Sequence, residues 1–178
     1  MTTGRGDTSE MKRAQAAHNP LLAELKAVHA MLRRDLAACR QLAIAAANGA
    51  PTAQIRSGIK QLQTRGPLFQ LRSNCLRHCH TVHAHHEGED AGLFPSARRA
   101  APHMRATIDR LQADHRVVSD LLDQVEGVAR NLQNSGDSRA RLVDALTALS
   151  THLLAHLDFE EKALAPILLT MKARPSHR

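Results

Sequence analysis

Twelve of the 178 residues are histidine, and two stretches of the chain place histidines and carboxylates in the same order. His85 is followed four residues later by Glu89, and His156 is followed four residues later by Glu160. In both stretches a second carboxylate comes next, and a proline lies ten residues after the histidine. Imidazole nitrogens and carboxylate oxygens are ligands for transition metals. The repeated order therefore predicts a metal site with approximate two-fold symmetry.

The four-residue spacing brings both donors of each pair to one side of a helix, since residues i and i+4 differ by only about 40° around the axis. Two further histidines, His29 and His115, lie beside leucines at helical spacing and are predicted to point into the same interior. The six groups suit two iron or manganese ions, with bridging carboxylates and room for water or a diatomic ligand. The second carboxylates, Asp90 and Glu161, point about 100° away, so we expect them to act on the ligands rather than on the metal.

Four amphipathic segments must hold these side chains in place. Asn19-Pro20 predicts a helix start, Phe94-Pro95 predicts the end or a turn of the second long helix, and residues 134–138 predict a turn. Long helices are expected over residues 20–48, 68–93, 102–132 and 138–172, with a shorter helical piece at 52–65. This pattern predicts an all-α fold, an up-down-up-down four-helix bundle.

The length fits one domain, with a bundle at residues 18–172 between a disordered segment at 1–17 and a basic tail at 173–178. Only 2% of residues are aromatic, which leaves little for a tyrosyl radical or a base-stacking platform. Cysteine usage and the lack of an apolar leader favour a cytoplasmic location, and no apolar stretch is long enough for a membrane span. Cys75 and Cys79 are poorly aimed for a disulfide and are predicted to be small core residues.

The segment HHEGEDAGLFP, together with AHLDFEE and the single histidines of two other segments, resembles the hemerythrin-like, or HHE cation-binding, domain, especially its bacterial branch. The resemblance covers about residues 18–170. It implies a hemerythrin-like bundle with a non-haem di-iron centre, its two irons joined by an oxo or hydroxo bridge. Such a centre binds or reacts with oxygen, hydrogen peroxide or nitric oxide in oxidative or nitrosative stress. Manganese and zinc are the alternative metals. Carried over residue by residue, the implied ligands are His29, His85, Glu89, His115, His156 and Glu160.

The chain departs from the animal oxygen carriers of this family at Ser119, where they have a second histidine four residues after the ligand of the third helix. The departure argues against reversible oxygen transport and predicts that one iron has fewer imidazoles and a more open face. His86 and His152 are extra candidates, and His152 would either complete the ligand set or gate the pocket. Five other histidines are predicted to be surface residues: His18, His78, His80, His103 and His177.

A catalase-like enzyme that disproportionates peroxide is the main alternative to a binding or sensing module, and the sequence leaves open whether the protein is an enzyme. Metal storage and a DNA-binding regulator are weaker alternatives, the latter indicated only by short basic runs. A zinc protease is disfavoured because the H-E-x-x-H pattern is broken at Asp90, and the Glu-x-x-His motif of ferritin-like oxidases is missing. The expected partner is a diatomic ligand or peroxide, with no specific nucleic acid and no membrane; the oligomeric state stays open.

Overall fold

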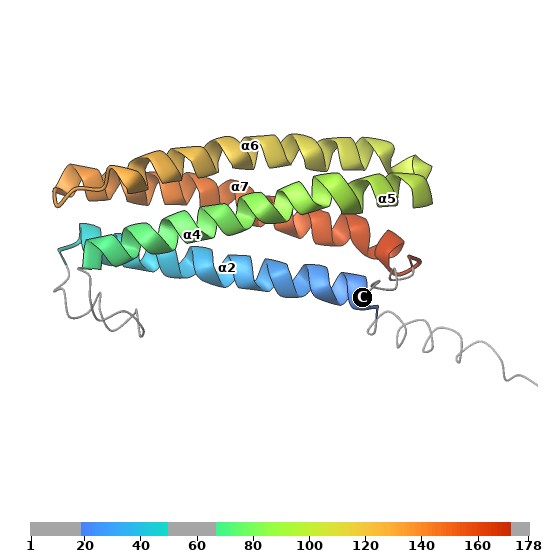
Figure 1. The fold of residues 1–178 in the computed structure, drawn as a ribbon, viewed down its shortest axis with the longest axis horizontal. Coiled ribbons are helices and arrows are strands. Elements are labelled where there is room, and N and C mark those ends of the chain that lie inside the picture. Colours follow the sequence, from blue (N-terminus) through green and yellow to red (C-terminus); the bar gives the residue numbers. More distant parts are fainter. Residues whose placement is uncertain (1–18, 50–66, 172–178) are drawn as a thin grey trace, which may run out of the picture.

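The computed structural model describes residues 19–49 and 67–171, most of which are helical (Figure 1). Four long helices run the length of the molecule: α2 (Pro20–Ala47), α4 (Pro67–Gly88), α6 (Arg105–Arg130) and α7 (Gly136–Leu168). Three short elements join α4 to α6: the π-helical turn η1 (Glu89–Leu93), α5 (Phe94–Ala100) and the 3₁₀ turn η2 (Pro102–Met104). The described residues contain no β-strand.

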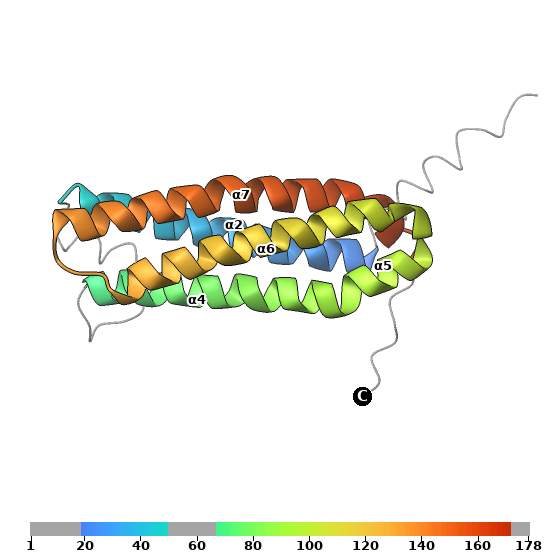
Figure 2. The same cartoon turned by 90° about the horizontal axis from the view of Figure 1, so that it is seen from above.

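The long helices form a ring in which α2 and α6 each pack against both α4 and α7. Consecutive long helices run in opposite directions, as the view from above shows (Figure 2). The predicted all-α, up-down-up-down four-helix bundle is therefore confirmed. No helix in the described part of the chain is long and apolar enough to cross a membrane. The predictions for residues 1–17, 52–65 and 173–178 lie outside the described residues.

The inner faces of the helices follow a spacing that alternates between three and four residues. Buried side chains of α2 keep this spacing from Leu22 to Ala46, and those of α6 keep it from Ile108 to Ala129. Helices with this spacing present a continuous seam to their neighbours in a bundle. His29 and His115 occupy positions in these two seams. The pattern that builds the core therefore also carries the imidazoles into it.

Side-chain caps set the ends of the helices near the predicted places. The Asn19 side chain accepts hydrogen bonds from the backbone N–H groups of Leu21 and Leu22, and it donates one to the carbonyl of Leu168 over 2.7 Å. Gly49, with a positive φ of 70°, follows the end of α2. Ser135 caps α7, so this helix begins inside the predicted turn, and it ends at Leu168 rather than at residue 172.

Of the two predictions for Phe94-Pro95, the end of the second helix is wrong, because the helix continues through η1 into α5 as far as Ala100, whereas a change in the helix does occur directly before Phe94, at η1. Buried positions follow the three-four spacing up to Glu89, and the next one, Phe94, comes five residues later. The wider π turn absorbs this extra residue. In a regular α-helix the Pro95 ring would crowd the carbonyl four residues before it, and the wider turn relieves that contact.

Buried apolar residues form two clusters separated by a polar layer. The larger cluster includes Leu32 of α2, Cys75 of α4 and Leu153 of α7. The smaller one, at the end of the bundle where α2 begins, includes Leu25 and Phe94. Apart from His78, the buried histidines and glutamates lie along the helices between the two clusters. A layer of unpaired polar groups costs stability, so it needs a compensating ligand or a network of hydrogen bonds.

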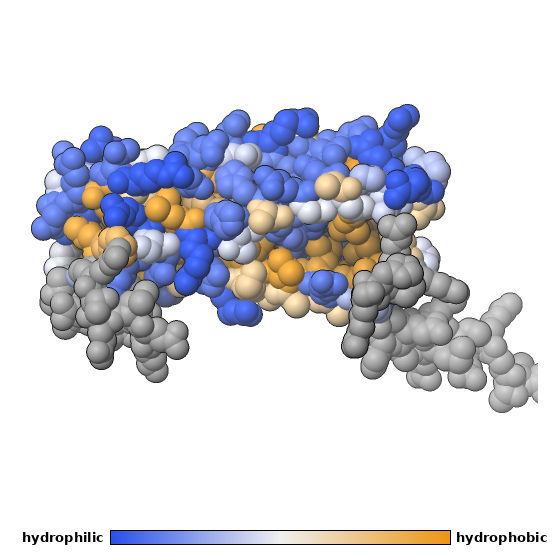
Figure 3. Space-filling view, viewed as in Figure 1, coloured by the Kyte–Doolittle hydropathy of each residue, from blue (hydrophilic) through white to orange (hydrophobic). Residues whose placement is uncertain are grey.

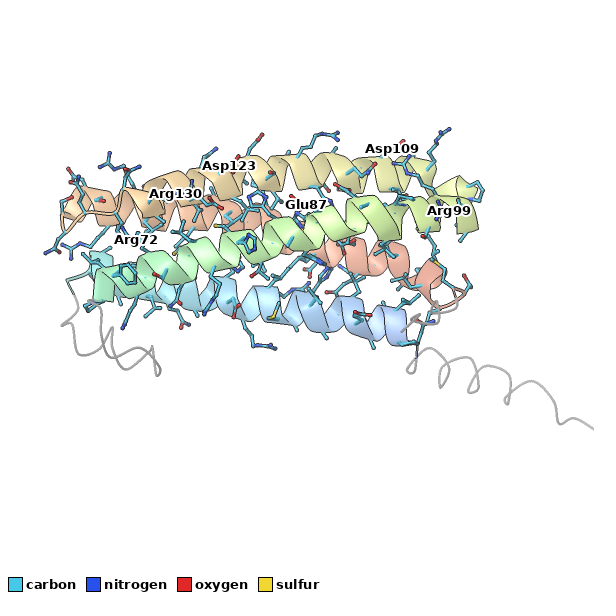
Figure 4. The ribbon with its side chains drawn as sticks, in the orientation of Figure 1. Arg72, Glu87, Arg99, Asp109, Asp123 and Arg130 are labelled. Atoms are coloured by element: carbon cyan, nitrogen blue, oxygen red, sulfur yellow. The ribbon has the colours of Figure 1, made fainter. Side chains whose placement is uncertain are left out.

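The outside of the bundle is mostly hydrophilic, with apolar side chains visible toward the end where α2 begins (Figure 3). Charged residues such as Glu87, Asp109 and Asp123 lie on the outer faces of α4 and α6 (Figure 4). Glu87 thus points away from the interior, although it is adjacent to a buried histidine in the chain.

Candidate metal centre

Side chains from all four long helices and from η1 meet in the polar layer. The six residues implied as ligands are brought together there, and His86 of α4 joins them. The donors form two groups in which all donor atoms lie within 4.8 Å of one another. One group consists of His86, His115 and His156, and the other of His29, His85, Glu89 and Glu160.

The two glutamates lie between these groups of histidines. Glu89 Oε1 lies 3.3 Å from His85 Nε2, while its Oε2 lies 3.6 Å from His115 Nε2. Glu160 Oε2 lies 3.4 Å from His29 Nε2 and 3.6 Å from His156 Nε2. Each carboxylate therefore faces both groups, which is the arrangement of a ligand shared by two cations.

Each of the second carboxylates holds the far nitrogen of a histidine. His29 Nδ1 donates to Glu161 Oε1 over 3.0 Å, and Arg33 donates to the same oxygen over 2.7 Å. Arg33 also pairs with Asp158. Because a carboxylate only accepts, the proton of His29 stays on Nδ1 and the lone pair of Nε2 faces the layer.

A matching chain of contacts holds His115 on the other side of the bundle. His115 Nδ1 lies 3.2 Å from Asp90 Oδ1, Gln112 donates to the same oxygen over 3.2 Å, and Arg98 donates to Gln112 over 2.5 Å. Arg98 therefore orients the imidazole through two intermediates. The short basic runs that indicated DNA binding include Arg33-Arg34 and Arg98-Arg99, and Arg33 and Arg98 are both engaged with groups around the centre.

The rings of three residues are stacked beside the polar layer. His86 stacks on His115 with ring centroids 3.9 Å apart and planes 8° apart, and Phe94 stacks with His115 at 5.1 Å. Such packing fixes the orientation of an imidazole without a hydrogen bond. The π turn that lets the helix continue is what brings Phe94 to this place.

Burial keeps several of the histidines neutral. Desolvation, with a smaller contribution from neighbouring imidazoles, lowers the pKa of His85 to about 4, and desolvation is also the main cause that lowers the pKa of His156 to about 4. The pKa values of His86 and His115 are lowered for the same reason. These imidazoles therefore offer lone pairs at neutral pH, as metal ligands must.

The pKa values of the two glutamates shift in opposite directions. Burial and the adjacent Glu160 raise the pKa of Glu89 to about 10. Burial also raises the pKa of Glu160, but the nearby imidazoles of His29 and His156 outweigh it, so its pKa is lowered overall. Two buried carboxylates side by side need a cation before both can ionise.

Many donor atoms of the layer have no hydrogen-bond partner among the described residues. They are Nε2 of His86, His115 and His156 and both carboxylate oxygens of Glu89 and Glu160. Buried polar atoms are almost always paired. Neutral nitrogens and carboxylate oxygens aimed at common points fit cations of the first transition series, so the residues present support a metal cofactor.

The structure corrects the prediction that His78 is a surface residue. His78 is only 2% exposed, and neither of its ring nitrogens has a hydrogen-bond partner among the described residues. It lies seven residues before His85, one heptad earlier on the same helix, and this spacing could have revealed its burial. His80 and His103 are exposed as predicted, whereas His18 and His177 lie outside the described residues.

His152 and Ser119 lie apart from the converging donors. His152 is exposed and lines a surface pocket of about 290 Å³, whose wall also includes His156, Asp114 and Phe159. It is therefore placed beside the centre rather than in it. Ser119 is half-buried. The expected shortage of imidazoles next to His115 is not found, because the His86 ring occupies that place.

Comparison with known proteins identifies a cation-binding family. The family model described as the hemerythrin HHE cation-binding domain matches residues 20–168, which is most of the chain. No curated protein and no solved structure matches the chain.

Proposed function

The chain belongs to the hemerythrin HHE cation-binding family, and from this premise we propose that the polar layer holds two iron ions that bind or react with oxygen, hydrogen peroxide or nitric oxide. The position of Glu89 carries the proposal: its two oxygens face histidines of different groups, at 3.3 Å and 3.6 Å. A single ion would not need a carboxylate turned in both directions.

The two groups of donors support the following assignment of ligands. His86, His115 and His156 would serve one ion, and His29 and His85 the other. Glu89 and Glu160, which face histidines of both groups, would be shared. His86 supplies the imidazole that the family's oxygen carriers place where this chain has Ser119. The ion served by His29 and His85 then has one imidazole fewer, and a small ligand would enter on that side.

The residues around the polar layer orient its ligands and exclude water from it. When bound, an iron pair supplies electrons and an open coordination position to a small oxidant. Glu161 and Asp90 fix the tautomers of His29 and His115, and the two apolar clusters exclude bulk water on both sides. None of these residues selects among oxygen, peroxide and nitric oxide, since all three are small and uncharged.

A catalase-like activity is the second candidate function, and it is favoured by the group with fewer imidazoles. In that case peroxide would be turned over rather than held. Hydrogen peroxide added to the iron-loaded protein should release oxygen over many turnovers if the protein is such an enzyme. A protein that binds and releases oxygen repeatedly, without peroxide turnover, would be a carrier.

Metal analysis tests the proposal directly. We expect about two iron ions per chain by mass spectrometry of the iron-loaded protein, because two sets of donors are present. The sequence contains no Trp and no Tyr, so absorption beyond about 300 nm must come from the metal centre. One zinc ion per chain, with no such absorption, would overturn the proposal.

A further inference from the structure

Three buried cysteines lie in the larger apolar cluster, away from the polar layer. Cys39 comes from α2, and Cys75 and Cys79 come from α4. All are at most 3% exposed. None of them belongs to the groups of possible metal donors found among the described residues.

The register of α2 against α4 brings Cys39 and Cys75 to the same level. In the polar layer, His29 Nε2 of α2 lies 3.1 Å from His85 Nε2 of α4. Cys39 lies ten residues after His29, and Cys75 lies ten residues before His85. Because the helices are antiparallel, equal steps in opposite directions keep two residues opposite each other. Ten residues are also one heptad plus three, which is a step from one core position to another.

Both thiols are buried in the same apolar cluster, and the register places them at the same level of two adjacent helices. The influence of the Cys75 thiol is the main cause that lowers the pKa of Cys39, against the opposing effect of burial. The influence of Cys39, together with burial, raises the pKa of Cys75. Burial raises the pKa of Cys79, to about 12. Of the three, Cys39 is the one whose thiolate the surroundings favour, and the thiolate is the reactive form.

We propose that Cys39 and Cys75 are a redox pair that closes into a disulfide between α2 and α4 when the protein meets hydrogen peroxide. The Cys39 thiolate attacks one peroxide oxygen, the O–O bond breaks, and the leaving hydroxide takes a proton to become water. The Cys75 sulfur then attacks the sulfenic sulfur of Cys39, a second water leaves, and the S–S bond forms. Two thiols are oxidised and one peroxide is reduced to two waters.

The bond would tie together two helices that carry donors of the polar layer. It would lie ten residues, or about 15 Å along each helix, from His29 and His85. It would also close a loop over the connection between α2 and α4, which raises resistance to unfolding. The reaction uses no residue of the polar layer, so it goes beyond the proposed iron chemistry and does not depend on it.

Cys79 provides a matched control. It is as buried as Cys75 and lies one turn further along the same helix. Two cysteines four residues apart on one regular helix are poorly aimed for a disulfide. Cys79 should therefore stay reduced, and Cys79→Ala should leave the cross-link intact.

Peptide mapping of the oxidised wild-type protein tests the proposal. The iron-loaded protein is treated with hydrogen peroxide or with diamide, a two-electron thiol oxidant, and is then denatured and alkylated. We expect the three thiols of the chain to fall to one, with a mass loss of about 2 Da before alkylation, and a cross-linked peptide that joins Cys39 to Cys75. Cys39→Ala and Cys75→Ala should each abolish the cross-link, with circular dichroism to check that they fold.

The wild-type map decides even if those variants fail to fold. Three alkylated thiols after both treatments, a bond that includes Cys79, or a bond between two chains would overturn the proposal. A bond formed by diamide but not by peroxide would also overturn it, since peroxide would not be the oxidant. Iron content measured on the same samples reports separately on the proposed function.

Discussion

At the scale of single residues, Glu89 and Asp90 are neighbours in the chain with different surroundings. Glu89 is buried between two groups of imidazoles, whereas Asp90 reaches the far nitrogen of His115 from the bundle surface. Glu160 and Glu161 repeat this division around His29. The sequence predicted it from helix geometry alone, because adjacent residues differ by about 100° around the axis.

Substitution within each pair should separate the two roles. We expect Glu89→Gln and Glu160→Gln to lose bound iron, while Asp90→Asn and Glu161→Gln keep two ions with an affinity lowered by roughly 10- to 100-fold. Iron content and titration against a chelator measure both effects. Equal loss from both members of a pair would show that the ligands are misassigned.

His86 and His152 provide a second contrast. His86 lies with His115 and His156 among the donors, and His152 lies at the surface. His86→Ala should weaken the binding of the ion served by His86, His115 and His156 and lower the iron content below two ions, because that group loses one of its three imidazoles. His152→Ala should leave the content unchanged. If iron content falls for His152→Ala and not for His86→Ala, the third imidazole beside His115 and His156 comes from His152 and not from His86.

The sequence contained the information that places His86 in the interior, although this was hard to use. Buried positions of α4 include Cys75, Cys79, Val82 and His86, which are four, three and four residues apart. His78 and His85 belong to a second series of positions that fits the helical spacing equally well. Because both series fit, only the packing of the neighbouring helices determines which of the two is buried more deeply.

At the scale of elements, the π turn η1 is the feature that periodicity alone could not assign. Phe94-Pro95 has the residue types of a helix end, and nothing in the local sequence shows that the chain instead widens by one residue and continues. The helix starts at Pro20 and Pro102 were predictable because proline fits the first helical position, and at Pro20 the preceding Asn19 adds a side-chain cap. Local signals set the ends of elements, while the π turn depends on the packing of Phe94 against His115.

Gly92 allows the role of the π turn to be tested. A Cβ added at Gly92 would meet no atom within 4 Å, so Gly92→Ala should keep the iron content and stabilise the fold by up to about 1 kcal/mol. Deleting Gly92 should remove the extra residue and replace the π turn by a regular α turn, which keeps Phe94 on the inner face but crowds the Pro95 ring against the carbonyl four residues before it, so the melting temperature should fall. Thermal unfolding and metal analysis of the two variants check this. A deletion variant with an unchanged melting temperature would show that the π turn does not relieve this contact.

At the scale of the whole molecule, buried imidazoles make the stability of the fold depend on pH. Desolvation lowers the pKa of His78 to about 4, with a small opposing effect of Asp35. The unfolded chain binds a proton at His78 below about pH 6.5, while the folded chain does not until about pH 4. The contribution of His78 to stability is therefore complete above pH 6.5 and is lost as the pH falls towards 4.

The variant His78→Met should lessen this dependence without touching the donors of the polar layer. Between pH 7.5 and pH 5, we expect the free energy of unfolding of the variant to fall by about 2 kcal/mol less than that of the wild type. Urea unfolding at the two pH values gives the difference. The same fall in both proteins would show that the His78 ring is already protonated in the folded state.

The topology of the bundle could be predicted from the sequence, whereas the contacts across it could not. Four long amphipathic segments with short connections permit few arrangements. Periodicity within one helix, however, does not set the register between two helices. For this reason Cys39 and Cys75, which are 36 positions apart in the chain, could not be recognised as neighbours, and neither could Arg33 and Glu161.

The hydrogen bond from Asn19 to the carbonyl of Leu168 fixes the beginning of α2 beside the end of α7. The chain therefore enters and leaves the bundle at the same end, and the turn between α6 and α7 lies at the opposite end (Figure 1). An affinity tag or a surface anchor on either end would hold the molecule in the same orientation. Because α2 begins beside the end of α7, a short linker could also join these two helices, and the chain could be reopened at the turn between α6 and α7. The product would be a circular permutant that retains every helix.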